Sequence, residues 1–213
     1  MLKLLGCLCA AMLSDIYMNN NIKKIIAFIL GLCMLFCITG CGDKGNGLTS
    51  DTQLSSSSYK LGDYMGDYTV TDTNGNTHTF SEILKDKKAI VLNFWFINCG
   101  PCQMEFPYLQ KAYEEYSDDI AVVAINPTTD KEIDIKKYGT QNELSIPLVK
   151  GDEAWIMAFA LQGFPTTVVI DRYGSIAFIH MGAVTQEGIF EKVFDVFTSD
   201  TYKQSTYRSI SDF

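Results

Sequence analysis

The chain has 213 residues, with 17 lysines and arginines against 25 aspartates and glutamates, and a formal net charge of -8. Its hydrophobic content of 47% is sufficient for a folded core, which excludes a wholly disordered chain. The acidic balance argues against nucleic acid as a partner, because non-specific binding to phosphates needs clustered basic residues. The length favours one domain with appendages over two full domains.

The cysteines are distributed unevenly along the chain. Five of the seven lie in the first 41 residues: Cys7, Cys9, Cys33, Cys37 and Cys41. The remaining chain holds only Cys99 and Cys102, together with two histidines, His78 and His180, that are not at ligand spacing. This distribution excludes a disulfide-stapled scaffold and a four-cysteine zinc site in the body, so we expect no metal site.

The N-terminal region predicts an export signal. Lys23 and Lys24 precede an apolar run at 25–36, which is the pattern of a secretory signal. The run leads into Ile38-Thr39-Gly40-Cys41, which resembles the bacterial lipobox. The resemblance implies cleavage just before Cys41 and lipidation of its sulfur, so residues 1–41 would be a lipoprotein signal peptide.

An uncleaved membrane anchor is the alternative for this region. The uncharged stretch 25–42 is at the lower length limit for crossing a bilayer. Either interpretation predicts that the rest of the chain lies on the extracytoplasmic face of the membrane. Residues 1–17 place a second apolar stretch and Asp15 ahead of the basic residues, so we expect that translation starts at Met18.

The rest of the chain divides into three parts. Residues 42–60 are polar and rich in glycine and serine, which predicts a flexible tether. Residues 61–197 alternate strand and helix patterns and predict a single domain. Residues 198–213 show no clear period and predict a loose C-terminal tail.

Within the domain, the first expected element is a β-hairpin, with strands at 68–72 and 77–80 joined by Asn74-Gly75. Four further strands are expected from apolar runs at 89–97, 120–125, 166–170 and 175–180. Four helices are expected at 101–117, 130–138, 153–161 and 188–197. The order predicts an α/β domain, a three-layer α/β/α sandwich with a mixed central sheet and an N-terminal β-hairpin.

Cys99-Gly100-Pro101-Cys102 lies where a buried strand passes into a helix. A helix N-terminus favours the thiolate that thiol chemistry needs, and Pro101 suits an early helical position. Cys99, just ahead of the helix, is expected to attack a disulfide, and Cys102, in the first turn, to resolve the mixed disulfide. Half of a zinc site and an inert structural disulfide are the alternatives, but so short a loop gains little stability from a disulfide.

The stretch Trp95-Phe96-Ile97-Asn98-Cys99-Gly100-Pro101-Cys102 resembles the active site of thioredoxins. Further along, Gly163-Phe164-Pro165-Thr166 resembles the cis-proline segment of that superfamily. The resemblance implies a thioredoxin-like fold, with Gly100 and Pro101 in the active-site loop and Pro165 cis beside the dithiol. It also implies that Phe164, Pro165 and Trp95 contact an extended substrate chain.

Within the superfamily, 102–107 resembles the membrane-tethered TlpA/ResA-like thiol–disulfide oxidoreductases. Classical thioredoxins carry a buried aspartate six residues before the first cysteine, where this chain has Asn93. An amide cannot accept the proton of Cys102, so another base is needed. Glu105 matches the acid of the TlpA/ResA-like group, which implies that it adjusts the thiol pKa values and relays a proton. Its alternative is an ordinary solvated helix glutamate.

The resemblance implies a reductase whose substrates are disulfides in exported proteins, as in cytochrome c maturation, with a membrane electron donor of the CcdA/DsbD type. The only redox centre expected is the Cys99–Cys102 disulfide, without a cofactor. Three alternatives stay open: an oxidant of folding exported proteins, a peroxiredoxin-like peroxidase and a non-enzymatic thioredoxin-fold binding module.

Overall fold

The computed structural model describes residues 58–207 and 210–213. The predicted signal peptide, Cys41 and most of the tether lie outside the described residues, so those assignments stay predictions. Within the described part of the chain, no helix is long and apolar enough to cross a membrane.

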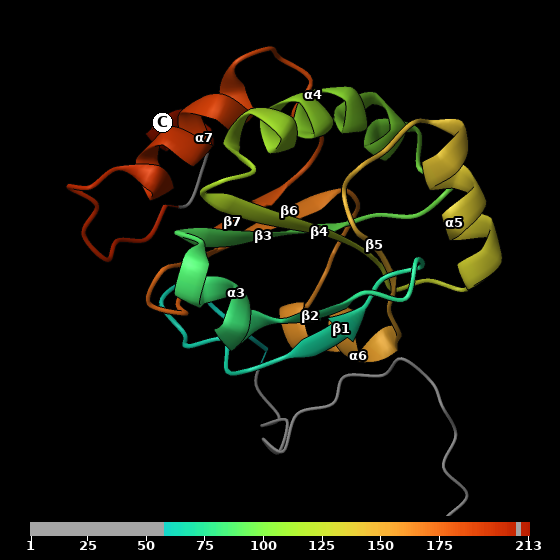
Figure 1. Ribbon diagram of the computed structural model, residues 1–213, viewed down its shortest axis with the longest axis horizontal. Coiled ribbons are helices and arrows are strands. Elements are labelled where there is room, and N and C mark those ends of the chain that lie inside the picture. Colours follow the sequence, from blue (N-terminus) through green and yellow to red (C-terminus); the bar gives the residue numbers. More distant parts are fainter. Residues whose placement is uncertain (1–57, 208–209) are drawn as a thin grey trace, which may run out of the picture. The chain divides into compact units, whose positions relative to one another are not determined.

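A five-stranded mixed sheet forms the centre of the domain (Figure 1). Its strands are β3 (Ala89–Phe94), β4 (Ile120–Asn126), β5 (Leu148–Lys150), β6 (Thr166–Asp171) and β7 (Ile176–Met181), in the spatial order β5-β4-β3-β6-β7. The β3, β4 and β5 strands are parallel, whereas β6 is antiparallel to both β3 and β7. The mixed sheet predicted from the element order is therefore confirmed.

The predicted N-terminal hairpin is also present, as β1 (Thr69–Thr71) and β2 (Thr77–Thr79) in a separate two-stranded sheet. Gly75 has a φ of 90° in its turn, a conformation that glycine adopts without strain. The buried Asp72 carboxylate accepts hydrogen bonds from the backbone N–H groups of Asn74 and Asn76. These hydrogen bonds fix the turn, and the Thr73 N–H donates to the Leu148 carbonyl on β5, which joins the hairpin to the main sheet.

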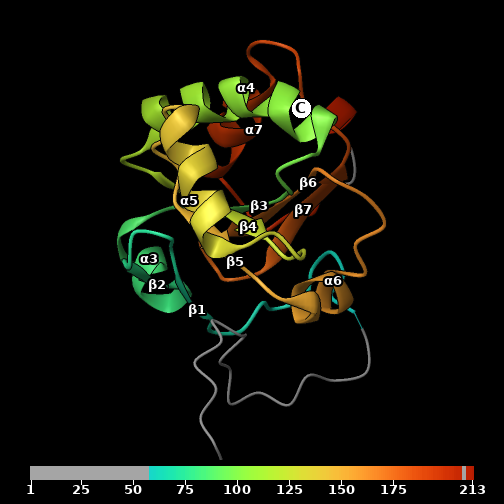
Figure 2. The same cartoon turned by 90° about the vertical axis from the view of Figure 1, so that its right-hand side faces the viewer.

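Helices cover both faces of the sheet (Figures 1 and 2). They are α3 (Phe80–Asp86), α4 (Gly100–Tyr116), α5 (Glu132–Gln141), α6 (Glu153–Phe159) and α7 (Ile189–Thr198). One face carries α4 and α7, and the other carries α3, α6 and the hairpin. Neither α3 nor β5 was predicted. The three residues of β5 are too few to show a hydrophobic period, and Phe80, the first residue of α3, was assigned to the preceding strand.

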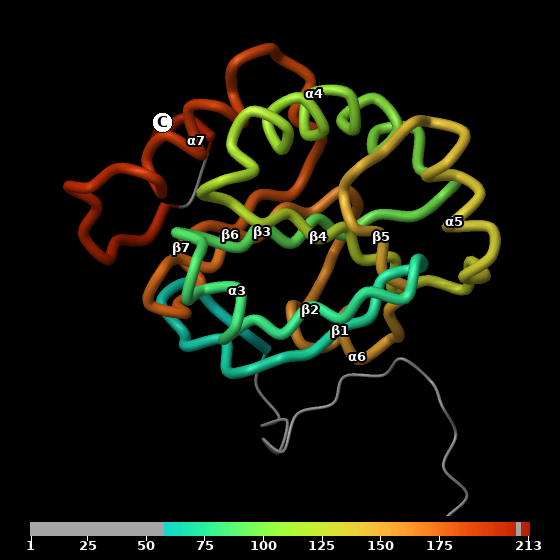
Figure 3. Tube along the Cα trace, viewed as in Figure 1, coloured from blue at the N-terminus to red at the C-terminus, as the bar shows by residue number. Residues whose placement is uncertain are grey.

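All six residues of β3 are buried, as expected for a strand covered on both faces. Ala89 and Val91 pack under α4, whereas Ile90, Leu92 and Phe94 face α6 and the hairpin. Because side chains alternate along a strand, Asn93 faces α4. Figure 3 shows the chain passing from the end of β3 into α4, which is where the two cysteines lie.

The prediction of a loose C-terminal tail is wrong for the described residues of this segment. Tyr202 is buried, and its hydroxyl donates a hydrogen bond of 2.9 Å to the buried Asp171 carboxylate. The Tyr207 N–H donates to the Ala177 carbonyl on β7, and the Phe213 ring packs against Phe178. The aromatic residues that pack here are irregularly spaced in the sequence. They therefore form no hydrophobic period, and the sequence did not predict that the segment is packed.

This packing gives a testable prediction. Tyr202→Phe should lower the free energy of unfolding by about 1–3 kcal/mol, because it removes one donor from a buried carboxylate. The midpoint of urea unfolding measures the change. Lys203→Ala, at the exposed neighbouring position, is the control and should have almost no effect. Equal stability of the Tyr202→Phe variant and the parent would contradict the packed arrangement.

Candidate active site

The two cysteines lie at the beginning of α4 and are joined by a disulfide. Cys99 is the N-cap residue of this 17-residue helix, and its sulfur accepts a hydrogen bond of 3.2 Å from the backbone N–H of Cys102. Pro101 occupies the first turn, where its missing N–H leaves no broken hydrogen bond. The hydrogen bond from the Cys102 N–H and the positive end of the helix dipole therefore both favour a thiolate at Cys99.

The exposed fractions of the two cysteines do not show which one attacks the substrate. Cys99 is 3% exposed and Cys102 is 1% exposed in this oxidised state, while Gly100 and Pro101 between them are exposed. The difference between the cysteines lies in their position on the helix, since only Cys99 is at the N-cap. The helix geometry thus supports Cys99 as the attacking residue.

The register of the sheet places Pro165 at the end of β3 that leads into the active-site loop. Thr166 pairs with Phe94 across β6 and β3, so Pro165 and the residue after Phe94 are neighbours where the two strands meet the active-site loop. The Phe164–Pro165 peptide bond is cis, which confirms the prediction made from the cis-proline segment. The Pro165 carbonyl accepts a hydrogen bond of 2.9 Å from the N–H of Gly182.

The assignment of Trp95 to substrate contact is wrong for this structure. Its side chain is 0% exposed and packs edge-on against Phe106 at 4.9 Å and against Tyr138 at 5.0 Å between ring centroids. The reason is the alternation of β3, which continues past Asn93 and turns the indole inward. Trp95 belongs to the hydrophobic core cluster that also contains Cys99 and Cys102.

Phe164 and Asn98 lie in different surroundings near Cys99. Phe164 is half-buried and packs edge-on against Phe96, with 5.5 Å between the ring centroids. Asn98, just before Cys99, is exposed and lines a cavity of about 320 Å³ with Asp130 and Tyr138. The approach to the dithiol therefore combines an apolar side with a polar one.

Glu105 is a buried residue and not a solvated one, since it is 1% exposed. It lies one helical turn after Cys102, on the same side of α4. One carboxylate oxygen, Oε1, accepts a hydrogen bond of 2.7 Å from the Asn93 side chain, and the other, Oε2, accepts one of 2.7 Å from the Val184 N–H. Burial raises the pKa of Glu105 to about 7, against the opposing effect of these two hydrogen bonds.

A carboxyl group with a pKa near 7 can take and release a proton at physiological pH, which is the property of a general base. The sequence predicted Glu105 and the replacement of the classical aspartate by Asn93. It did not predict Val184, which lies in the loop between β7 and α7. No sequence signal could have identified it, because any residue other than proline supplies a backbone N–H.

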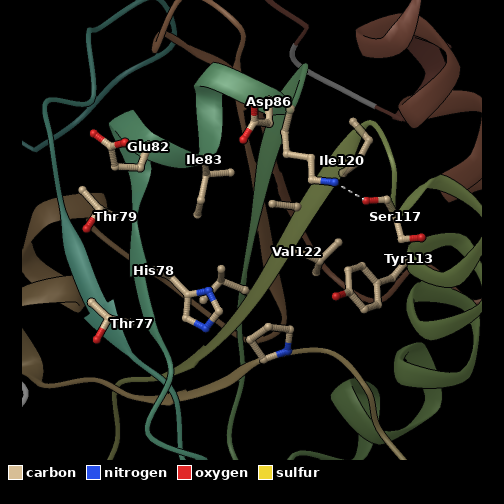
Figure 4. Close-up of a pocket in the computed structure, with 14 residues that line it drawn as sticks. Thr77, His78, Thr79, Glu82, Ile83, Asp86, Tyr113, Ser117, Ile120 and Val122 are labelled. Carbon is tan, nitrogen blue, oxygen red and sulfur yellow. Dashed lines mark hydrogen bonds between the residues drawn. The ribbon is translucent and has the colours of Figure 1, made fainter.

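A second cavity, of about 640 Å³, lies between the β2–α3 region and α4 (Figure 4). Thr77, His78 and Ile83 line it on one side and Tyr113 on the other, and neither cysteine borders it. His78 contacts Asp72 at 3.1 Å and is one of the residues that fix the hairpin. Among residues 58–207 and 210–213, no three His, Cys, Asp or Glu side chains lie together where they could hold a metal ion.

The mixed sheet, the disulfide at the start of α4 and the cis proline just before β6 define a thioredoxin-fold thiol–disulfide oxidoreductase. The chain belongs to the AhpC/TSA family, whose model matches residues 61–179. It is 29% identical over 135 residues to the thiol-disulfide oxidoreductase ResA of Halalkalibacterium halodurans, covering 62% of this chain and 74% of that protein.

Two further comparisons agree. The chain is 32% identical over 108 residues to the thioredoxin-like protein YneN of Bacillus subtilis, covering 50% of this chain and 64% of the relative. The crystal structure of StoA from Bacillus subtilis is similar, with a TM-score of 0.52 and 21% identity, and the match covers 63% of this chain and 97% of that chain. At this identity the likeness shows the fold alone.

The buried carboxyl group predicts a specific dependence of stability on pH. The folded-state pKa of Glu105 is raised above its ordinary value of 4.5, so the folded protein holds this proton more tightly than the unfolded chain. The stability from this proton is fully present below pH 4.5 and is lost as pH rises through about 7. Between these limits the loss is on the order of 3 kcal/mol.

Glu105→Gln removes this titration. The free energy of unfolding of the parent, minus that of Glu105→Gln, should therefore fall as pH rises from about 4 to about 8. Urea unfolding of both oxidised proteins across this range measures the difference. A difference that is constant with pH would show that Glu105 titrates normally.

Proposed function

We propose that this protein reduces disulfides in exported proteins at the extracytoplasmic face of the cell membrane, where a lipid on Cys41 holds it. The observation that carries the reductive direction is the buried Glu105 one turn behind the dithiol. A negative charge in this position disfavours a thiolate on Cys102, and a dithiol whose reduced form is less stabilised is a stronger electron donor.

The exchange follows from the positions of the two sulfurs. The Cys99 thiolate attacks one sulfur of the substrate disulfide, the substrate S–S bond breaks, and the released substrate sulfur takes a proton. Cys102 then gives its proton to the Glu105 carboxylate and attacks the Cys99 sulfur. This second attack breaks the mixed disulfide, releases the other substrate thiol and leaves the Cys99–Cys102 disulfide.

Each cycle transfers two electrons to the substrate. The protein must then be reduced again by a dithiol donor, for which a membrane protein of the CcdA/DsbD type fits the proposed location. The Cys99–Cys102 pair serves as the only redox centre in this scheme, without a cofactor. The backbone of Phe164 and Pro165 provides the surface for an extended substrate chain; the cis bond of Pro165, and its position at the end of β3 that leads to the dithiol, support this assignment. Cytochrome c maturation is one process that supplies such substrates.

The proposed mechanism predicts a covalent trap. Cys102→Ser should accumulate a mixed disulfide between Cys99 and its substrate, because the resolving sulfur is missing. Non-reducing electrophoresis and mass spectrometry of membranes from cells that express the variant measure the adduct. Cys99→Ser/Cys102→Ser is the matched control and should give none. If Cys102→Ser gave no more adduct than the double variant, the exchange mechanism would be overturned.

The direction of electron flow has its own test. The reductase proposal predicts that the oxidised pair equilibrates with glutathione at a potential near that of thioredoxin, about -270 mV. A potential near about -120 mV would favour the runner-up, an oxidant of folding proteins. Dithiol-dependent reduction of insulin separates both from a non-enzymatic binding module, and peroxide consumption tests the peroxidase alternative.

The location gives a further prediction. Cys41→Ser should abolish incorporation of radiolabelled palmitate and release the protein from washed membranes, because the lipidated sulfur is lost. Metabolic labelling and fractionation measure both effects, and Cys37→Ser is the matched control that should keep the lipid. If both variants stayed in the membrane without label, the uncleaved anchor would replace the lipid in the proposal.

A further inference from the structure

Asn93 is a buried amide in the middle of the central sheet. It is 1% exposed, and its lateral neighbours are Ala124 on β4 and Thr167 on β6. Burial of an amide is costly unless its polar atoms find partners. The Asn93 Nδ2 group makes two hydrogen bonds, one of 2.7 Å to Glu105 Oε1 and one of 3.2 Å to Thr167 Oγ1.

We propose that Asn93 is a positioning residue: its amide, fixed by Thr167, holds the Glu105 carboxylate between α4 and the sheet, behind the dithiol. This inference rests on the proposed role of Glu105 as the base for Cys102. Classical thioredoxins have an aspartate at this position. In this chain the position is Asn93, a hydrogen-bond donor, and the acid that it contacts is Glu105 on α4.

The orientation of the amide follows from its two partners. A carboxylate can only accept hydrogen bonds, so it selects the NH₂ side of the amide. Thr167 accepts the second hydrogen of the same NH₂ group, which directs the amide from the opposite side. The orientation of the amide toward Glu105 is therefore set by β3 and β6 together.

The surroundings of Glu105 make this hydrogen bond important. The carboxylate is in contact with Asn93 from β3 and with the Val184 N–H from the β7–α7 loop, and the dithiol lies on its own helix. Burial raises the pKa of Glu105, and these two hydrogen bonds lower it. After loss of the Asn93 donor, the Val184 N–H is the one of these two donors that remains.

Direct titration of Glu105 tests the proposal. Asn93→Leu keeps the approximate size of the side chain and removes the donor. The carboxyl carbon of Glu105, followed by ¹³C NMR in the oxidised protein, should titrate about one pH unit higher than in the parent, a tenfold change in proton affinity. Thr167→Val should raise the midpoint by less. An unchanged midpoint in Asn93→Leu would overturn the inference.

A second variant protects the test against misfolding of Asn93→Leu. Asn93→Asp places another carboxyl group against Glu105, and the pair should then titrate in two steps, one on each side of the parent midpoint. One unshifted step for Glu105 would overturn the inference. Asn126→Ser is the control, because it alters another buried asparagine, whose amide donates to Asp130. It should leave the Glu105 midpoint unchanged.

The pH dependence of Cys99 alkylation in the reduced protein separates this inference from the proposed function. If Asn93→Leu shifts the Glu105 midpoint and the alkylation profile does not follow, the positioning role stands and the role of Glu105 in exchange falls. If Glu105→Gln changes the profile while Asn93→Leu leaves the Glu105 midpoint unchanged, the positioning role falls and the proposed function stands.

Discussion

The Glu105 carboxylate, buried between α4 and the central sheet, is the interaction on which the arrangement of the site depends. Its two hydrogen bonds join α4 to β3 and to the loop after β7. The α4 helix contains Cys102 and has Cys99 as its N-cap, and β3 pairs with β6, which begins just after Pro165. The Glu105 carboxylate thereby links the helix that positions the dithiol to the sheet that positions the cis proline.

Burial of the Glu105 carboxyl group lowers the stability of the fold. A carboxyl group taken from water loses hydration, and two hydrogen bonds restore only part of it, which is why its pKa stays near 7. The carboxyl group is shielded from water and lies one helical turn from Cys102, where the proposed function needs a proton acceptor.

The fold and the dithiol could be predicted from the sequence because their signals are local. Continuous apolar runs predicted β3 and β4, and Cys99 and Cys102 lie at a strand–helix junction that the same pattern reveals. Trp95 was misassigned because a motif gives the order of residues and not the direction of their side chains. Val184 and the packed C-terminal segment depend on tertiary contacts, a backbone N–H and scattered aromatic rings, that leave no pattern in the sequence.

The position of Glu105 on α4 also determines how its pKa would change if this helix moved during thiol–disulfide exchange. An acid on β3 would be fixed to the sheet, so any shift of α4 would change its distance from Cys102. Glu105 is on the same helix as Cys102, and this distance is therefore set by helix geometry. A shift of α4 would instead change the two hydrogen bonds that Glu105 accepts from Asn93 and Val184. Both hydrogen bonds favour the ionised carboxylate. Movement of the helix away from these donors would raise the pKa of Glu105 and so strengthen its hold on the proton from Cys102.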